Sequence, residues 1–190
     1  LELSVRREKE AKHFETMLRE RAMPLGMKNL STKVKITHGE LTPDGCDNVE
    51  FLFSFNKNQP LMPVGGTASG GEISRLMLSI KAIIAAKMQL PSIIFDEVDT
   101  GVSGDVADRM GLMMKDIAQN IQVTAITHLP QVAAKGSAHF KVYKEDDEHA
   151  THTRIRRLSQ EERIEELAVM LSGSKVDDAA KANAKSLLNI

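Results

Sequence analysis

One stretch, residues 68–97, constrains the fold of this chain more than any other. Glycines at positions 70 and 71 precede a segment in which apolar residues recur every three to four positions, which predicts a long helix that ends before Pro91. The predicted apolar stripe comprises Ile73, Leu76, Met77, Ile80, Ile84 and Met88. A short apolar run at 93–95 follows and ends in Asp96 and Glu97, a pattern typical of a buried parallel strand. We therefore expect an α/β fold in which a helix start and an acidic strand end can both face a ligand.

A second strand follows the first after one intervening helix. Residues 105–120 show helical spacing of apolar residues, and residues 121–126 form another β run that ends before Thr127 and His128. A strand–helix–strand unit places its two strands parallel and side by side. We therefore expect Asp96, Glu97 and His128 to lie at one edge of the same sheet.

Several of these segments resemble a known family. Residues 68–72, Ala-Ser-Gly-Gly-Glu, resemble the ABC signature motif, and residues 93–97, Ile-Ile-Phe-Asp-Glu, resemble a Walker B strand. Residues 95–104 and 127–133 also resemble segments of one family, and all of these segments follow one another in that family's order. From Val34 onward, the chain is therefore similar to the RecN-like bacterial DNA repair proteins, which are SMC-like ABC ATPases. The resemblance implies the C-terminal lobe of an ABC-type P-loop ATPase head, a mainly parallel sheet flanked by helices, with a charged N-terminal helix.

The resemblance also implies roles at the strand ends. Asp96 would hold Mg²⁺ through water, Glu97 would polarise the water that attacks ATP, and His128 would contact the γ-phosphate. Each residue also has a structural interpretation. An Asp-Glu pair after a strand is often a solvated turn, and a single histidine is often a satisfied core or surface residue.

The signature and the loop after Glu97 are implied to act across a dimer. Ser69, Gly70 and Gly71 would contact ATP held by the facing subunit, and Asp99 would reach across as the D-loop aspartate. Alternatively, Ser69 is an ordinary N-cap and Asp99 caps its own turn. The usual Leu at the first signature position is Ala68 here, a packing position at which the change does little harm.

The chain contains no Gly-x-x-x-x-Gly-Lys-Ser/Thr sequence, the P-loop that cradles most of a bound triphosphate. In the family this Walker A loop lies in the N-terminal half of the head. The implied partners are therefore that N-terminal half and a second head in a homodimer. We expect this chain alone to bind ATP weakly and to hydrolyse it negligibly.

The first 24 residues are charged and prone to form a helix. They predict either a solvated helix with one weak apolar stripe or the returning end of a coiled-coil arm, with residues 33–190 forming the head lobe. Elsewhere the patterns predict strands at 33–39, 49–55, 139–144 and 151–158, a short helix or turn at 129–135, and helices at 160–171 and 177–188.

Composition limits the remaining choices. The net charge is −1, one cysteine is present, and no apolar run is long enough to span a bilayer, which predicts a cytoplasmic protein with no membrane partner. Association with the bacterial nucleoid is implied by the resemblance alone. A role in DNA double-strand break repair and recombination, with DNA as a partner, rests on the resemblance, because the basic residues, among them Arg154, Arg156 and Arg157, are commonly solvated. A non-catalytic interaction lobe and an SMC-type chromosome-organising ATPase remain the alternatives.

Overall fold

The computed structural model describes residues 2–64, 68–88, 90–96, 98–147, 150–173 and 176–190. Its helices are α1 (Glu2–Ala22), the 3₁₀ turn η1 (Met23–Leu25), α2 (Gly70–Met88), α3 (Gly104–Ile117), α4 (Pro130–Ala133), α5 (Gln160–Ser172) and α6 (Asp178–Leu188). Its strands are β1 (Ser31–Thr42), β2 (Gly45–Ser54), β3 (Met62–Pro63), β4 (Ser92–Asp96), β5 (Gln122–Ile126), β6 (Phe140–Asp146) and β7 (Thr151–Arg157). The helices and strands expected from the sequence are confirmed within a few residues at their ends.

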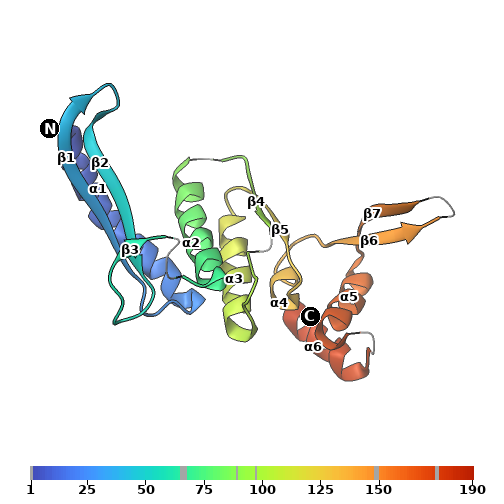
Figure 1. The fold of residues 1–190 in the computed structure, drawn as a ribbon. Coiled ribbons are helices and arrows are strands. Elements are labelled where there is room, and N and C mark those ends of the chain that lie inside the picture. Colours follow the sequence, from blue (N-terminus) through green and yellow to red (C-terminus); the bar gives the residue numbers. More distant parts are fainter. Residues whose placement is uncertain (1, 65–67, 89, 97, 148–149, 174–175) are drawn as a thin grey trace.

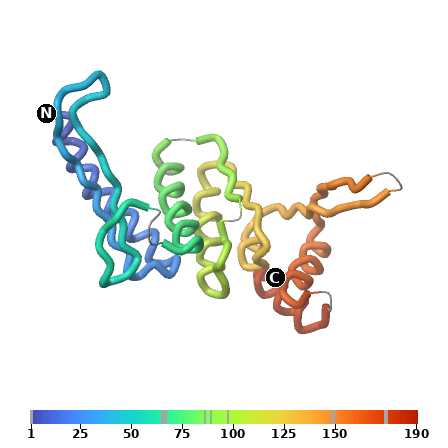
Figure 2. The backbone as a smooth tube through the Cα atoms, in the orientation of Figure 1, coloured from blue at the N-terminus to red at the C-terminus, as the bar shows by residue number. Residues whose placement is uncertain are grey.

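The elements follow one another across the molecule nearly in chain order (Figure 1). The long β1–β2 hairpin and α1 lie together at one end, α2 and α3 form the middle, and α5, α6 and the β6–β7 hairpin form the other end. The backbone trace shows the same elongated arrangement (Figure 2). The β4–β5 pair therefore lies between the two ends, beside α3 and α4.

Helix α1 is attached to the β1–β2 hairpin by apolar and polar contacts. The rings of Phe14 and Phe51 meet edge to face, with their centroids 5.6 Å apart. The backbone N–H of Val34 donates to the Glu15 carboxylate at 2.7 Å. Leu18 and Ala22 at the end of the helix are fully buried in the main core. The N-terminal segment is thus a helix packed along a sheet, and its membership in a longer arm stays a prediction.

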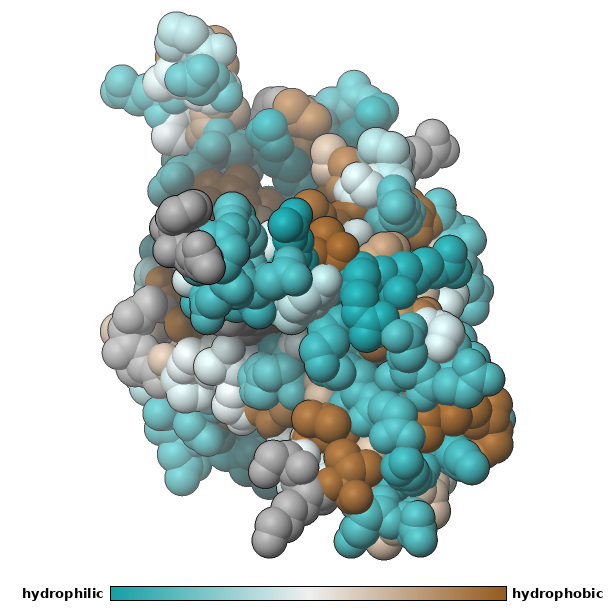
Figure 3. Space-filling view, turned by 90° about the vertical axis from the view of Figure 1, so that its right-hand side faces the viewer, coloured by the Kyte–Doolittle hydropathy of each residue, from teal (hydrophilic) through white to brown (hydrophobic). Residues whose placement is uncertain are grey.

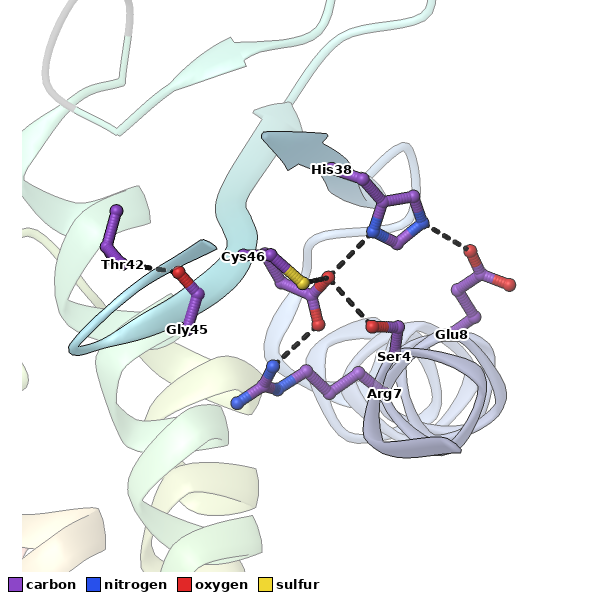
Figure 4. Close-up of polar contacts among 8 residues, drawn as sticks. Ser4, Arg7, Glu8, His38, Thr42, Gly45 and Cys46 are labelled. Carbon is purple, nitrogen blue, oxygen red and sulfur yellow. Dashed lines mark hydrogen bonds and ion pairs between the residues drawn. The ribbon is translucent and has the colours of Figure 1, made fainter. Parts of the chain in front are cut away.

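A cluster of polar contacts joins the start of α1 to the same hairpin (Figure 4). The carboxylate of Asp47 accepts from the Ser4 hydroxyl at 2.9 Å and from the Arg7 guanidinium at 2.6 Å, and it lies 2.7 Å from Nδ1 of His38. The other ring nitrogen of His38 lies 3.6 Å from the Glu8 carboxylate. These partners, Arg7 first, hold the pKa of the Asp47 carboxyl well below its usual range. The ion pairs therefore set how α1 lies on the hairpin.

Helix α2 contacts the first strand of the central pair at Phe95. Leu76, Leu78 and Phe95 are almost fully buried in one cluster, and Nζ of Lys81 lies 5.5 Å from the centre of the Phe95 ring. Helix α2 and the strand that ends in Asp96 thus share the main core.

The predicted apolar stripe of α2 is only partly right. The core receives Leu76, Leu78, Ala82, Ile83 and Ala85, whereas Met77, Ile84 and Met88 of the predicted stripe are exposed. A helix that is apolar nearly all round gives no unique inward face from its sequence, so its neighbours in space decide which face is buried.

Strands β4 and β5 pair in parallel, as the strand–helix–strand pattern predicts. Burial on both faces is not observed, because Phe95 is fully buried while Ile94 is 61% exposed and Ile126 is 53% exposed. A parallel strand is buried on both sides only when helices cover both faces of its sheet. Among the described residues, parallel pairing is confined to these two strands, and the other ladders are antiparallel.

The C-terminal part has its own small core. Leu167, Ala168, Ala180 and Ala184 pack α5 against α6 and contact Ala134 next to α4. Viewed from this end, the surface is largely hydrophilic with separate hydrophobic patches (Figure 3). None of the helices within the described ranges combines the length and the apolar character needed to cross a bilayer.

Candidate functional site at the ends of the central strands

The two central strands end side by side. Asp96, the last residue of β4, pairs in register with Ile126, the last residue of β5, and Thr127 and His128 follow directly. The side chains of Asp96 and His128 are exposed, His128 to 66%. The predicted common rim of the sheet is therefore confirmed for Asp96 and His128, whereas Glu97 lies outside the described residues.

The loop after β4 returns into the molecule at Asp99, which is only 1% exposed. Its Oδ2 accepts a hydrogen bond from the Thr127 hydroxyl, and that hydroxyl oxygen accepts one from the Leu129 N–H at 3.0 Å. Its Oδ1 lies 3.6 Å from Nδ1 of His128. The backbone carbonyl of Asp99 also accepts from the Val102 N–H at 3.1 Å, which closes a turn. In this structure the carboxylate faces its own chain.

Helix α2 begins with a reciprocal cap. The Ser69 hydroxyl accepts from the Glu72 N–H at 3.3 Å, and the Glu72 carboxylate accepts from the Ser69 N–H at 2.9 Å. This arrangement is a capping box, so the N-cap interpretation of Ser69 holds here. The same geometry leaves the start of the helix exposed at Ser69 and Gly70.

The two glycines at the start of α2, Gly70 and Gly71, differ in their surroundings. A Cβ at Gly70 would meet nothing within 4 Å, whereas a Cβ at Gly71 would lie 3.4 Å from the Thr100 carbonyl oxygen. The start of α2 therefore packs against the loop after β4 at Gly71, whereas Gly70 is exposed. Such a helix start can accept an anion.

Asp96 suits a magnesium ion bound mainly by phosphate and water. Mg²⁺ usually takes one or two carboxylates and keeps several waters. An exposed carboxylate at a strand end meets this requirement. Among the described residues, no three His, Cys, Asp or Glu side chains lie together so as to form a metal cage by themselves.

The structure adds Thr127 to the residues considered from the sequence. Its hydroxyl links Asp99, in the loop after β4, to the segment that carries His128. The only sequence signal for this link is its position directly before His128 at the end of β5. A hydroxyl residue at that place is too common to be identified without the fold.

No protein-family model matches the chain. Curated proteins do match, each named DNA repair protein RecN. The protein of Vibrio cholerae is 41% identical over 180 residues, which cover 94% of this chain and 32% of that protein. That of Rickettsia conorii is 41% identical over 188 residues, covering 99% of this chain and 34% of its own length. That of Bacillus subtilis is 46% identical over 149 residues, which cover 78% of this chain and 26% of that protein.

Solved structures of SMC heads share the fold. An SMC head bound to the C-terminal winged-helix domain of ScpA superposes with a TM-score of 0.63 at 18% identity, covering 83% of this chain and 46% of that one. The Pyrococcus furiosus Smc head with an extended coiled coil gives a TM-score of 0.62 at 20% identity, and the match covers 87% of this chain and 39% of that one. These similarities show the ABC ATPase head fold.

The sequence matches cover nearly the whole of this chain, and the chain spans about a third of the length of the relatives from Vibrio and Rickettsia. The chain belongs to the RecN family of bacterial DNA repair proteins, of which it represents the C-terminal portion.

Proposed function

We propose that this chain is the C-terminal half of an ATPase head that acts in DNA double-strand break repair and recombination. It supplies the signature motif, the Walker B carboxylates and the switch histidine to a site completed by two other parts. These parts are the N-terminal half of the head, which carries the Walker A loop, and the facing head of a homodimer. Residues 1–24 would be the end of the coiled-coil arm, and residues 33–190 the head lobe.

One observation carries the proposal, the parallel register that ends β4 at Asp96 and β5 just before Thr127 and His128. Ligands of open α/β sheets bind at the carboxyl ends of parallel strands. The exposed start of α2 at Gly70 supplies a second, separate anion-binding element of the kind that the signature role requires.

Two features support the need for an additional lobe. The chain has no P-loop sequence, although phosphoryl transfer requires a phosphate cradle. In addition, Ile94 and Ile126 expose large apolar side chains on one face of the central strands. A sheet of this class is normally covered on both faces, so this face suits the N-terminal half of the same head.

The residues then divide the work as follows. Bound Mg²⁺ would neutralise charge on the phosphate oxygens. Asp96 would hold this ion through water, Glu97 would orient the attacking water and accept its proton, and His128 would donate a hydrogen bond to the γ-phosphate. Ser69, Gly70 and Gly71 cap the nucleotide bound by the facing head, next to the D-loop segment that begins at Asp99.

The test compares the chain alone with the chain mixed with the N-terminal half of the head. We expect negligible ATP turnover by the chain alone and DNA-stimulated turnover by the mixture. Glu97→Gln in the complete protein should trap an ATP-bound head dimer. Turnover by the chain alone at the rate of the mixture contradicts the division into halves. A mixture that binds but never hydrolyses ATP supports a non-catalytic interaction lobe instead.

DNA is the proposed partner of the complete protein, and the bacterial cytoplasm, at the nucleoid, its proposed location. Both proposals rest on the family, since the relatives are named for DNA repair. The salt dependence of DNA binding by the complete protein would measure how many phosphate contacts it makes.

A further inference from the structure

We propose that Asp99 is a positioning residue for His128 within its own chain, and that the Thr127 hydroxyl holds Asp99 in place for this task. The inference rests on the proposed function, because it assigns the support of a histidine placed at the γ-phosphate. It differs from the role across the dimer that the resemblance implies for Asp99.

The burial of Asp99 requires an explanation. A carboxylate that is only 1% exposed carries a large desolvation cost unless both of its oxygens are paired. Oδ2 has the Thr127 hydroxyl as its donor, while Oδ1 has no hydrogen-bond donor among the described residues. Oδ1 is therefore a buried hydrogen-bond acceptor that can still receive a donor.

The imidazole of His128 lies close to that acceptor. Its Nδ1 lies 3.6 Å from Oδ1, beyond a hydrogen bond, and the ring is mostly exposed. Contacts of this kind are often long without substrate and tighten when the reactive complex forms. A small rotation of the exposed ring would bring Nδ1–H onto Oδ1.

The consequence is a defined tautomer. If Nδ1 donates its N–H to Asp99, Nε2 faces the site, where it accepts a hydrogen bond when the ring is neutral and donates one to phosphate when the ring is protonated. A carboxylate that orients a histidine in this way also stabilises its protonated form. Thr127 contributes by fixing the other oxygen, and its link to the Leu129 N–H ties the pair to the segment that enters α4.

The first experiment reads the tautomer directly. The complete protein is labelled with ¹⁵N-histidine, saturated with a non-hydrolysable ATP analogue and Mg²⁺, and examined by long-range ¹H–¹⁵N NMR at pH 8, where an ordinary imidazole with a pKa of about 6.5 is neutral. His128→Gln assigns the signal. We expect His128 to favour Nδ1–H in the wild type and to shift toward Nε2–H in Asp99→Asn, because the amide can donate to Nδ1. Asp105→Asn is the matched control, since Asp105 is an exposed aspartate paired with Arg109.

The second experiment measures ATP turnover by the complete protein. We expect Asp99→Asn to lower kcat by about 10- to 100-fold, the loss typical when the partner that orients a metal-bound histidine is removed, with KM for ATP little changed. Thr127→Val should lower kcat less, Thr127→Ser should restore it, and Asp105→Asn should match the wild type.

Two results would overturn the proposal. One is the same His128 tautomer in the wild type and in Asp99→Asn. The other is an Asp99→Asn protein that loses ATP-dependent head dimerisation while its kcat per dimer is unchanged, which assigns Asp99 to the facing subunit. Failure of the proposed function is separate, because it would appear as unchanged turnover in His128→Ala whatever the NMR result.

Discussion

Gly111 lies in a close contact between α3 and the segment of α4, and replacing it with alanine tests that contact. A Cβ built on Gly111 would lie 2.8 Å from Cγ of Lys135 and 3.2 Å from both the Gln131 carbonyl oxygen and the Val132 Cα. The Lys135 side chain can move, but the other two atoms belong to the backbone. The helices must therefore separate by a few tenths of an ångström to admit one methyl group.

Two opposing effects set the size of the change. Alanine in a helix interior is favoured over glycine by about 0.5–1 kcal/mol. Overpacking a tight contact costs about 1–3 kcal/mol. Movement of Lys135 also weakens its 2.7 Å ion pair with Asp108. We expect Gly111→Ala to lower the free energy of unfolding by about 1 kcal/mol net, the difference between these two ranges.

The assay is urea unfolding of the chain, followed by circular dichroism. Gly70→Ala is the matched control, because it makes the same substitution at the start of α2, where a Cβ meets nothing within 4 Å. We expect its unfolding midpoint to equal or exceed that of the wild type. A Gly111→Ala protein as stable as Gly70→Ala would refute the close α3–α4 packing on which the argument depends.

Asp47→Asn should lower the urea midpoint at pH 7, because Arg7 and His38 then face a neutral amide in place of a charged carboxylate. The lowered pKa of Asp47 contributes stability above the usual value of about 3.9, so the gap between wild type and variant should narrow as pH falls below that value. Burial is the main reason that the pKa of His139 is lowered in the folded chain. As pH drops below about 6.5, the unfolded chain therefore binds a proton at this histidine before the folded chain does, and the free energy of unfolding should fall. His139→Gln should reduce this loss of stability. Ser159→Ala removes the capping box at the start of α5 and should cost about 1 kcal/mol in urea unfolding.

Each of these variants has a control. Asp44→Asn changes an exposed aspartate in the turn between β1 and β2 and should leave the midpoint unchanged at all pH values. His13→Gln, on α1, should leave the acid sensitivity below pH 6.5 as large as in the wild type. Ser159→Asp should keep the stability that Ser159→Ala loses, because aspartate caps helices equally well. If a variant and its control show the same unfolding midpoint and the same pH dependence, the physical reasoning behind that variant is wrong.

Local pattern was enough to predict most of the fold. Apolar spacing located the helices and strands, and the strand–helix–strand order correctly predicted the parallel pairing of β4 with β5. That pairing in turn brought Asp96 and His128 to one rim, although they are far apart in the chain. These features depend on neighbours in sequence and on a general rule of connection, both of which a sequence contains.

Burial and pairing between distant side chains could not be predicted in this way. The sequence of α2 is apolar on several faces, so only its neighbours in space determined that Leu78 is buried and Met77 exposed. The inward turn of Asp99 and its bond to Thr127 depend on how two loops meet after separate strands. Periodicity records what a residue's own element prefers, whereas the orientation of a side chain at a loop is decided by the atoms that surround it in the folded chain.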